Sequence, residues 1–318
     1  MIESTPFQLL VLIASIIGLA SASHFTIKSI ERIIEITGLS DASAGFVILA
    51  VLTSTPEIIV AIFAVIQGNP AVSVGDVLGS NIFNIGMVLG ILGILGYLKI
   101  CCTDILVELT DMLSVTVAIP LLLVISQFQI LEIPTPVIGA ILLASFAISV
   151  YLIAKKRLPP VIVNGKGKKR DKRKIAVVIA ILLLSFSGVV LSAQLTVASA
   201  SNLAIALGIP AILVGAKIVS IGTSLPELTT ALAAARRRRT HLAVGDIIGS
   251  CLTNLTLVLG VVLIISPFNV DLTVFTEILP FLLITTIIFW RFIVRGGISK
   301  VGGAILILTY ILFQILIF

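Results

Sequence analysis

Hydrophobic residues are grouped along this chain in long runs, and short polar segments separate one run from the next. An α-helix of about 20 residues spans about 30 Å of hydrocarbon, because each residue adds about 1.5 Å. Most of the runs reach that length. The pattern therefore predicts an all-α membrane protein with ten transmembrane helices, over residues 7–27, 43–67, 74–96, 105–127, 135–154, 175–198, 205–234, 243–266, 273–293 and 301–318.

The segment 45–90 occurs twice, and the second copy, 215–260, aligns with it at a constant offset of 170 residues without a gap. Much of the apolar sequence differs between the copies, whereas polar residues, prolines and glycines inside the apolar helices are shared. An internal repeat is a strong sign of architecture, and in membrane transporters the substrate site lies where the repeats meet. The shared residues are Thr53, Ser54, Pro56, Glu57, Gly75, Asp76, Gly79, Ser80 and Asn84 in the first copy and Thr223, Ser224, Pro226, Glu227, Gly245, Asp246, Gly249, Ser250 and Asn254 in the second.

Each copy belongs to a group of five predicted helices, which divides the chain into a first repeat, 1–154, a basic linker, 155–174, and a second repeat, 175–318. Because five is odd, the two copies must cross the membrane in opposite directions. The turn after the second helix of each group supports this, since 67–70 carries no charge and 236–239 consists of four arginines. Basic residues collect on the cytoplasmic side. The predicted fold is thus two inverted-topology repeats of five helices.

The charge of the chain fits one orientation. The residues are 58% hydrophobic and 11% charged, with a net charge of +6, whereas soluble domains are about 25% charged. With the N-terminus outside, every lysine and arginine except Lys217 falls in an inner loop. We therefore expect a multi-pass protein of the plasma membrane with both termini outside and 155–174 in the cytoplasm. The lipid bilayer is the expected surrounding, and neither a nucleic acid nor an obligate protein partner is expected.

Glu57 and Glu227 lie near the middle of apolar helices. A charged residue at that depth costs on the order of 2.5–3.5 kcal/mol and usually marks an ion pathway. Two carboxylates brought together by the repeat would repel each other unless cations lay between them. A protonated, hydrogen-bonded glutamate could explain one such residue, but it explains a duplicated pair poorly.

Each glutamate follows a group of oxygen ligands. Thr53-Ser54 and Thr223-Ser224 place hydroxyls three and four residues before it, on the same helical face. The proline just before each glutamate frees carbonyls one turn earlier, and free carbonyls are tolerated where they line a cavity. Carboxylate, hydroxyl and carbonyl oxygens suit Na+ or Ca2+, whereas a softer metal would call for His or Cys.

The next helix of each copy carries a second polar face. Ser80 and Asn84 are four residues apart, as are Ser250 and Asn254, so each pair is expected to close the site from its own helix. Asp76 and Asp246 lie near the starts of these helices, where capping and a role in admitting ions are both open. The shared glycines form GxxxG patterns, which favour close packing of helices.

The motif TSxPE followed by GDxxGSxxxN, present twice and inverted, resembles the alpha repeats of the cation/calcium antiporter superfamily, in its sodium/calcium exchanger branch. The resemblance covers essentially the whole chain. It implies no resident cofactor, since Ca2+ and Na+ are the transported ions, and it implies that helices 1 and 6 slide across the rigid remainder. It also implies Ca2+ ligands at Thr53, Glu57, Thr223 and Glu227, and Na+ ligands at Ser54, Ser80, Asn84, Ser224, Ser250 and Asn254 together with Glu57 and Glu227.

Three positions depart from the family pattern or from the repeat. The first copy has Leu52 where the second has Gly222 and the family has glycine, so the first helix break is expected to be tighter. The last polar position is Asn in both copies, whereas K+-dependent members carry Asp in the second, so K+ dependence is not expected. Lys217 replaces Val47 within the membrane. Its side chain either extends to the outer interface or pairs with a carboxylate and alters ion preference.

The expected function is secondary antiport of Na+ against Ca2+ by alternating access, electrogenic and independent of K+. Antiport of Ca2+ or another divalent cation against H+ is the main alternative, although the proton-coupled branch usually carries GNxxE rather than TSxPE. A passive cation channel is a further alternative. The chain lacks HExxH, GxSxG or a comparable nucleophile motif, so an enzyme is not expected.

Overall fold

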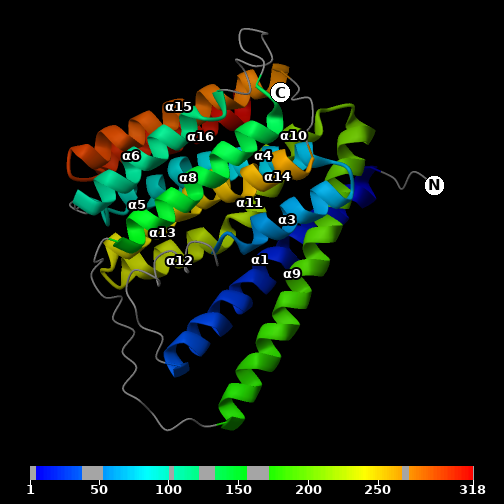
Figure 1. The fold of residues 1–318 in the computed structure, drawn as a ribbon, viewed down its shortest axis with the longest axis horizontal. Helices are drawn as coiled ribbons and strands as arrows, with labels where there is room; N and C mark the ends of the chain where they lie inside the picture. The colour runs from blue at the N-terminus through cyan, green and yellow to red at the C-terminus, as the bar shows by residue number, and fades with distance from the viewer. Residues whose placement is uncertain are drawn as a thin grey trace.

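The computed structural model describes residues 5–37, 53–99, 104–121, 133–155, 172–266 and 272–317. Regular structure within these ranges is helical throughout (Figure 1). The helices are α1 (Thr5–Thr37), α3 (Thr55–Ile66), α4 (Pro70–Ile82), η1 (Phe83–Val88), α5 (Leu89–Ile94), α6 (Asp104–Ala118), α8 (Thr135–Lys155), α9 (Lys172–Leu207), α10 (Ala211–Val214), η2 (Gly215–Val219), α11 (Ser220–Thr223), α12 (Leu225–Arg236), α13 (Thr240–Thr253), η3 (Asn254–Val258), α14 (Leu259–Ile265), α15 (Leu272–Val294) and α16 (Lys300–Leu316). The three η segments are π-helical.

Within the described ranges, seven helical segments are long and apolar enough to cross a membrane. Each coincides with one of the predicted transmembrane helices, and α3 and α16 are shorter apolar helices. Parts of the predicted helices 43–67 and 105–127, and most of the linker 155–174, lie outside the described residues. The segments are Pro6–Ser29, Pro70–Ile94, Thr135–Leu152, Ala176–Leu207, Ala211–Arg236, Thr240–Ile265 and Glu277–Val294.

Several predicted helix limits are wrong. α6 ends at Ala118, inside the predicted helix 105–127, and α10 begins at Ala211 instead of 205. α1 continues to Thr37 rather than ending at 27, because the charged residues that follow the apolar run are good helix formers and no glycine or proline intervenes before Gly38. α9 continues to Leu207 rather than ending at 198. Its real end is Gly208, which adopts a left-handed φ of 65° and precedes Pro210 by two residues.

The packing of the helices repeats between the two halves. α3 packs against α4 as α12 packs against α13, and α5 packs against α16 as α14 packs against α8. α6 pairs with α15, and α1 pairs with α9, each across the halves. The last helix of each half therefore packs on the opposite half. This exchange is what two inverted repeats related by a pseudo-two-fold axis produce.

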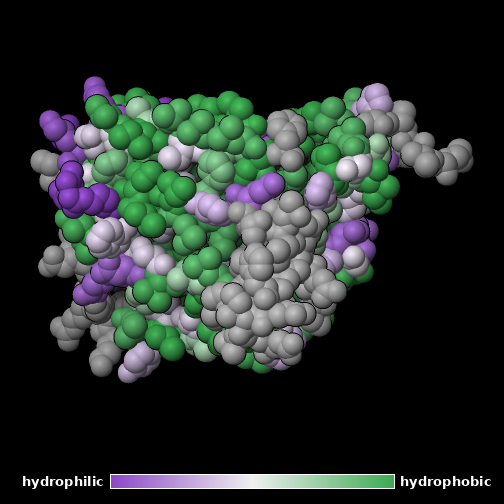
Figure 2. Space-filling view, turned by 90° about the horizontal axis from the view of Figure 1, so that it is seen from above, coloured by the Kyte–Doolittle hydropathy of each residue, from purple (hydrophilic) through white to green (hydrophobic). Residues whose placement is uncertain are grey.

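The helices of the two repeat motifs are central. In both Pro70–Ile94 and Thr240–Ile265, 83% of the apolar window is buried, against 33% in α1 and 17% in α9. Figure 1 shows α1 and α9 as two long helices that extend beyond the rest of the bundle. Figure 2 shows hydrophobic residues over much of one face, with hydrophilic residues mostly toward one end, as expected for a surface in contact with lipid.

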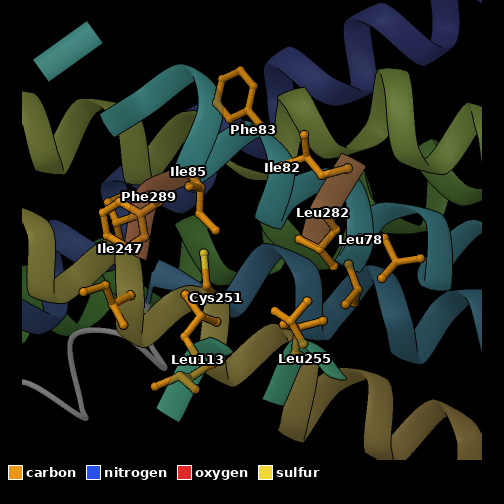
Figure 3. Packing of buried hydrophobic residues seen from close by; sticks show 14 of the residues in the cluster. Leu78, Ile82, Phe83, Ile85, Leu113, Ile247, Cys251, Leu255, Leu282 and Phe289 are labelled. Carbon is orange, nitrogen blue, oxygen red and sulfur yellow. The ribbon is translucent and has the colours of Figure 1, made fainter. Parts of the chain in front are cut away.

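The core around the central helices draws on both halves of the chain (Figure 3). Its side chains are aliphatic and aromatic, and Cys251 lies among them as a small buried residue. The close-up labels Leu78, Ile82, Phe83, Ile85, Leu113, Ile247, Cys251, Leu255, Leu282 and Phe289. This apolar packing fixes the positions of α4 and α13, on which the polar residues of the repeats are carried.

Two reciprocal hydrogen bonds join α1 to α9. Thr196 Oγ1 donates to Ser15 Oγ at 3.0 Å, and Thr26 Oγ1 donates to Ser185 Oγ at 3.0 Å. At the offset of 170 residues, Ser15 corresponds to Ser185 and Thr26 to Thr196, so the two bonds are one contact repeated by symmetry. They fix the register of these two helices against each other.

Candidate ion-binding site

Both repeat motifs contain a break in the helix at the serine of TSxPE. α11 ends at Thr223 and α12 begins at Leu225, with Ser224 at φ −89° and ψ 5° between them. In the first copy, α3 begins at Thr55 after Ser54, whose φ and ψ are −77° and 10°. The prolines lie in the first turn of α3 and of α12, where a missing N–H is tolerated. The sequence prediction of a break at this position is confirmed.

The break places each glutamate at the start of a new helix. Glu57 lies in the first turn of α3 and Glu227 in the first turn of α12, and both are fully buried. The positive end of a helix dipole stabilises a carboxylate at that position. Ser224 Oγ of the second half donates to Glu57 Oε1 of the first half at 3.4 Å. The two glutamates are near enough to interact electrostatically.

The motif threonine of the second half contacts side chains of the first half. Thr223 Oγ1 donates to Asp76 Oδ1 at 2.8 Å and lies 3.2 Å from Ser80 Oγ. Ser80 also donates to Asp76 Oδ1, at 3.4 Å. The three side chains form a cluster that joins α11 to α4.

The first half makes the same contact in return. Thr53 Oγ1 shares a hydrogen bond of 2.8 Å with Ser250 Oγ and donates to Asp246 Oδ1 at 3.3 Å. Each copy thus supplies the threonine to one cluster and the aspartate and serine to the other. Neither cluster is complete within one repeat, so the site exists only where the halves meet.

Asp76 and Asp246 belong to these clusters, and the alternative that they cap the starts of their helices is wrong. Neither α4 nor α13 has an acidic residue in its first turn. Asp76 is fully buried and Asp246 is 1% exposed. Their presence in both copies is the signal that places them in the site, and a role in admitting ions stays a prediction.

Asn84 and Asn254 mark a change of helix type. Asn84 lies in η1 and Asn254 begins η3, which are π-helical turns inside long helices. Such turns often occur at functional sites. All ten residues expected as ligands are 0% exposed: Thr53, Ser54, Glu57, Ser80, Asn84, Thr223, Ser224, Glu227, Ser250 and Asn254.

Several buried polar atoms of this set have no hydrogen-bond partner in the described part of the chain. They include Glu57 Oε2, both carboxylate oxygens of Glu227, Ser54 Oγ and the side-chain amide oxygens of Asn84 and Asn254. Buried polar atoms are normally hydrogen-bonded, so these oxygens lack the partners that such burial requires. Their chemistry, hard oxygen on both halves, fits a Na+ or Ca2+ ion as the missing partner.

The donor set also limits which ion would fit. Within the described ranges, His, Cys, Asp and Glu side chains do not gather in groups of three or more that could hold a metal ion. A cation bound here would therefore rely on two glutamates supplemented by hydroxyl, amide and carbonyl oxygens. That composition disfavours transition metals, which prefer imidazole or thiolate.

The first glycine pattern serves close packing. A Cβ at Gly75 would overlap the carbonyl oxygen of Ile212, and a Cβ at Gly79 would overlap that of Ala216. α4 therefore lies with its backbone against α10 and η2, the segment that leads into the helix break. For this pair of glycines, the predicted packing role is confirmed.

Lys217 extends away from the glutamates. Its Nζ donates to the carbonyl oxygens of Gln314, at 3.1 Å, and of Ile317, at the end of α16. The acidic side chain that acts on it is Glu277 of α15. A cation at the C-terminal end of a helix is stabilising. Lys217 thus fastens η2 to α16, and a role of Lys217 in ion preference stays a prediction.

Two inverted halves, each with a broken helix that carries a buried carboxylate, define the class of secondary cation transporters. A family model described as sodium/calcium exchanger protein matches residues 7–155 and 177–318. The chain belongs to this family, and the superfamily resemblance of the sequence motifs is confirmed.

Named relatives agree with this assignment. The chain is 30% identical to the putative antiporter CaxA of Alkalimonas amylolytica, over 97% of each chain. It is 27% identical to the sodium/calcium exchanger MaX1 of Methanosarcina acetivorans, over 97% of this chain and 98% of the relative.

Solved structures share the fold. The sodium–calcium exchanger NCX_Mj, soaked with 100 mM Na+ and 10 mM Sr2+, is 25% identical, with a TM-score of 0.64 over 97% of this chain and 98% of that one. The H+/Ca2+ exchanger CAX is 19% identical, with a TM-score of 0.77 over 96% of this chain and 81% of that one. The arrangement of the helices is thus more similar to CAX, although the sequence is more similar to NCX_Mj.

Proposed function

We propose that this protein is a secondary antiporter that exchanges Na+ for Ca2+ across the plasma membrane by alternating access, and that it is not an enzyme. The observation that carries the proposal is that Glu57 and Glu227, from inverted halves, are fully buried, interact electrostatically and each carry unpartnered oxygens. Such oxygens favour a cation between the halves, and a site at the repeat interface is what alternating access requires.

We assign the Ca2+ ligands to Thr53, Glu57, Thr223 and Glu227. The hydrogen bonds of the threonines support this assignment. Thr223 gives its hydroxyl proton to Asp76, so its oxygen presents lone pairs and not a hydrogen to a cation. Thr53 has the same relationship with Asp246. The flanking Na+ sites are assigned to Ser54, Ser80, Asn84, Ser224, Ser250 and Asn254, with Glu57 and Glu227 shared between both ions.

The charges of the site and of the ions determine whether exchange depends on the membrane potential. One Ca2+ neutralises two ionised glutamates, whereas three Na+ leave one positive charge. Exchange in that ratio moves net charge, and its driving force changes by about 2.3 kcal/mol per charge for each 100 mV. Since Asn254 provides no third carboxylate, K+ is not needed for charge balance.

Antiport of Ca2+ against H+ is a second candidate. The H+/Ca2+ exchanger CAX shares the fold with a TM-score of 0.77, so the fold is compatible with H+ coupling, but an identity of 19% supports the fold alone. The identity of 27% with the sodium/calcium exchanger MaX1, over nearly the whole chain, favours Na+.

The deciding experiment is uptake of radioactive Ca2+ into proteoliposomes under imposed Na+, K+ or H+ gradients. We expect uptake to follow the outward Na+ gradient, to increase with an inside-positive potential, which drives net charge outward, and to be unchanged by K+. Uptake that persists without Na+ and follows a pH gradient would contradict the proposal and indicate H+ coupling. Uptake without any counter-ion would indicate a channel.

The ligand assignment has its own test. Glu57→Gln and Glu227→Gln should each abolish exchange, because a neutral amide cannot balance Ca2+. Glu108→Gln is the matched control, since Glu108 is an exposed acidic residue of α6. If either Glu57→Gln or Glu227→Gln transports as the unsubstituted protein does, the site assignment is wrong.

The orientation is likewise proposed from the charges, with both termini outside and 155–174 cytoplasmic. A membrane-impermeant thiol reagent would test it on single cysteines placed at position 68 and at position 238. Position 68 should react from outside intact cells, whereas position 238 should react only after permeabilisation.

A further inference from the structure

A short arginine turn joins α12 to α13. Arg236 is the last residue of α12, and Thr240 begins α13. Both helices belong to apolar segments long enough to span the membrane, Ala211–Arg236 and Thr240–Ile265. A link of three residues cannot extend far beyond the ends of these helices. The guanidinium groups of the run 236–239 are therefore held at the level of the lipid headgroups.

The side chains of these arginines form no ion pair within the described chain. All four side chains are exposed, and among the described residues no carboxylate forms an ion pair with any of them. Their charge is thus not used to hold parts of the described structure together. It is available to anions that approach the end of the bundle.

Arg238 occupies a backbone position suited to glycine. Its φ is 59°, and at the offset of 170 residues it corresponds to Gly68, whose φ is 72°. The two turns have the same hydrogen bonds: Arg238 N donates to the Ala235 carbonyl at 2.9 Å, and Gly68 N to the Val65 carbonyl at 3.1 Å. A side chain in this left-handed region is strained. Orientation by positive charge does not require an arginine at this position, because three adjacent arginines already provide that charge.

We propose that the arginine run 236–239 is a binding surface for the phosphate groups of anionic membrane lipids, and that lipid bound there holds the α12–α13 hairpin. Guanidinium groups bind phosphate in a bidentate manner, and each basic residue near a membrane surface strengthens attraction to anionic lipid several-fold. The hairpin carries Glu227 and Asp246, so loss of the lipid should reach the ion site. The equivalent uncharged turn, 67–70, provides no such surface.

The first test is binding, measured as thermal unfolding of the purified protein in neutral detergent with added phosphatidylglycerol or phosphatidylcholine. Phosphatidylglycerol should raise the unfolding temperature, and phosphatidylcholine should not. A variant with all four arginines changed to Gln should lose this rise. A variant with Arg291→Gln, Arg295→Gln and Lys300→Gln should keep this rise. It removes positive charge around the α15–α16 link, at the same end of the bundle, but leaves the run 236–239 intact (Figure 1).

Single variants separate charge from strain. Arg238→Gly should raise the unfolding temperature without lipid, because glycine relieves the left-handed conformation. It should also lower the apparent affinity for phosphatidylglycerol by about five-fold. Arg237→Gln should lower that affinity similarly without the gain in basal stability. These variants keep the test decisive if the four-fold variant does not fold.

Three results would overturn the proposal. The first is an equal shift with both lipids, and the second is an unchanged shift in the four-fold variant. The third is a shift reproduced by inorganic phosphate at the same concentration, which would indicate a site for free anions. Because unfolding is measured without transport, these outcomes do not depend on which ions are exchanged. In proteoliposomes, Ca2+ uptake should be several-fold faster with phosphatidylglycerol than with phosphatidylcholine alone, and the four-fold variant should lose that difference.

Discussion

Thr223 of the second half donates a hydrogen bond of 2.8 Å to Asp76 of the first half. The same relationship runs in the other direction from Thr53 to Asp246. Each half therefore positions the hydroxyl that the other half contributes. Each helix break is thus tied to α4 or α13 of the other half through side chains and not only through packing.

Asp76→Ala and Thr223→Val are each expected to weaken the apparent Ca2+ affinity by about ten-fold or more, because a hydrogen bond to a charged acceptor contributes about 1.5–3 kcal/mol. The double variant should lose little beyond Thr223→Val alone, since Asp76 acts on the bound ion through its hydrogen bond with Thr223. The measurement is the Ca2+ concentration that gives half-maximal exchange. Thr110→Val is a matched control, because Thr110 is equally buried but donates to a carbonyl within α6. Additive losses would contradict the coupling.

Asn254→Asp is expected to introduce K+ dependence. A third carboxylate at the start of η3 leaves one negative charge after Ca2+ binds, and a further monovalent cation is then needed to balance it. Ca2+ exchange by this variant should increase about several-fold when K+ is added on the Ca2+ side, whereas the unsubstituted protein should not respond. Asn84→Asp provides the symmetric comparison in η1. A variant indifferent to K+ and fully active would show that Asn254 lies outside the ion site.

Lys217→Met is expected to destabilise the protein without changing ion affinity. It removes the contacts with the end of α16, and hydrogen bonds from a charged donor contribute about 1.5–3 kcal/mol. Thermal unfolding in detergent should occur at a lower temperature, while the apparent Ca2+ affinity should change by less than about two-fold. Lys217→Arg should restore most of the stability. An altered affinity at unchanged stability would mean that Lys217 acts on the ions directly.

Cross-links between cysteines are expected to separate the moving helices from the rigid ones. If α1 and α9 slide together, a disulfide between Ser15→Cys and Thr196→Cys should leave exchange intact, since it replaces an existing contact. A cross-link between Gln67→Cys and Gln194→Cys through a reducible bis-methanethiosulfonate spacer should stop exchange, because it ties the end of α3 to α9, where the Gln67 side-chain amide donates to the Gln194 carbonyl at 3.4 Å. Both pairs are placed in a background without Cys101, Cys102 and Cys251. Reduction should restore the activity of the second pair. Continued exchange while Gln67→Cys and Gln194→Cys are cross-linked would rule out sliding of α9 past α3.

Most of the membrane topology could be predicted from the sequence, because crossing a bilayer requires apolar helices of a set length. The helix break at Ser224 could also be predicted, since Pro226 cannot donate to the preceding turn. The end of α1 could not be predicted from hydropathy, because charged and helix-forming residues continue past the apolar run to Thr37. The end of α9 is set by Gly208 and not by hydropathy, since the apolar segment itself extends to Leu207. Hydropathy detects the part of a helix that crosses the lipid, so it does not detect how far that helix continues beyond the membrane.

The sequence by itself determined the repeat, its inversion and the residue types of the site, because these follow from local pattern, charge and offset. Only the tertiary structure decided which residues meet. Thr223 faces Asp76, and Lys217 faces the end of α16. Contacts between residues 97 and 147 positions apart depend on how the halves pack, and that packing is set by the apolar core and by glycines that let the backbones touch. Local sequence pattern does not indicate which residues so far apart along the chain will be in contact.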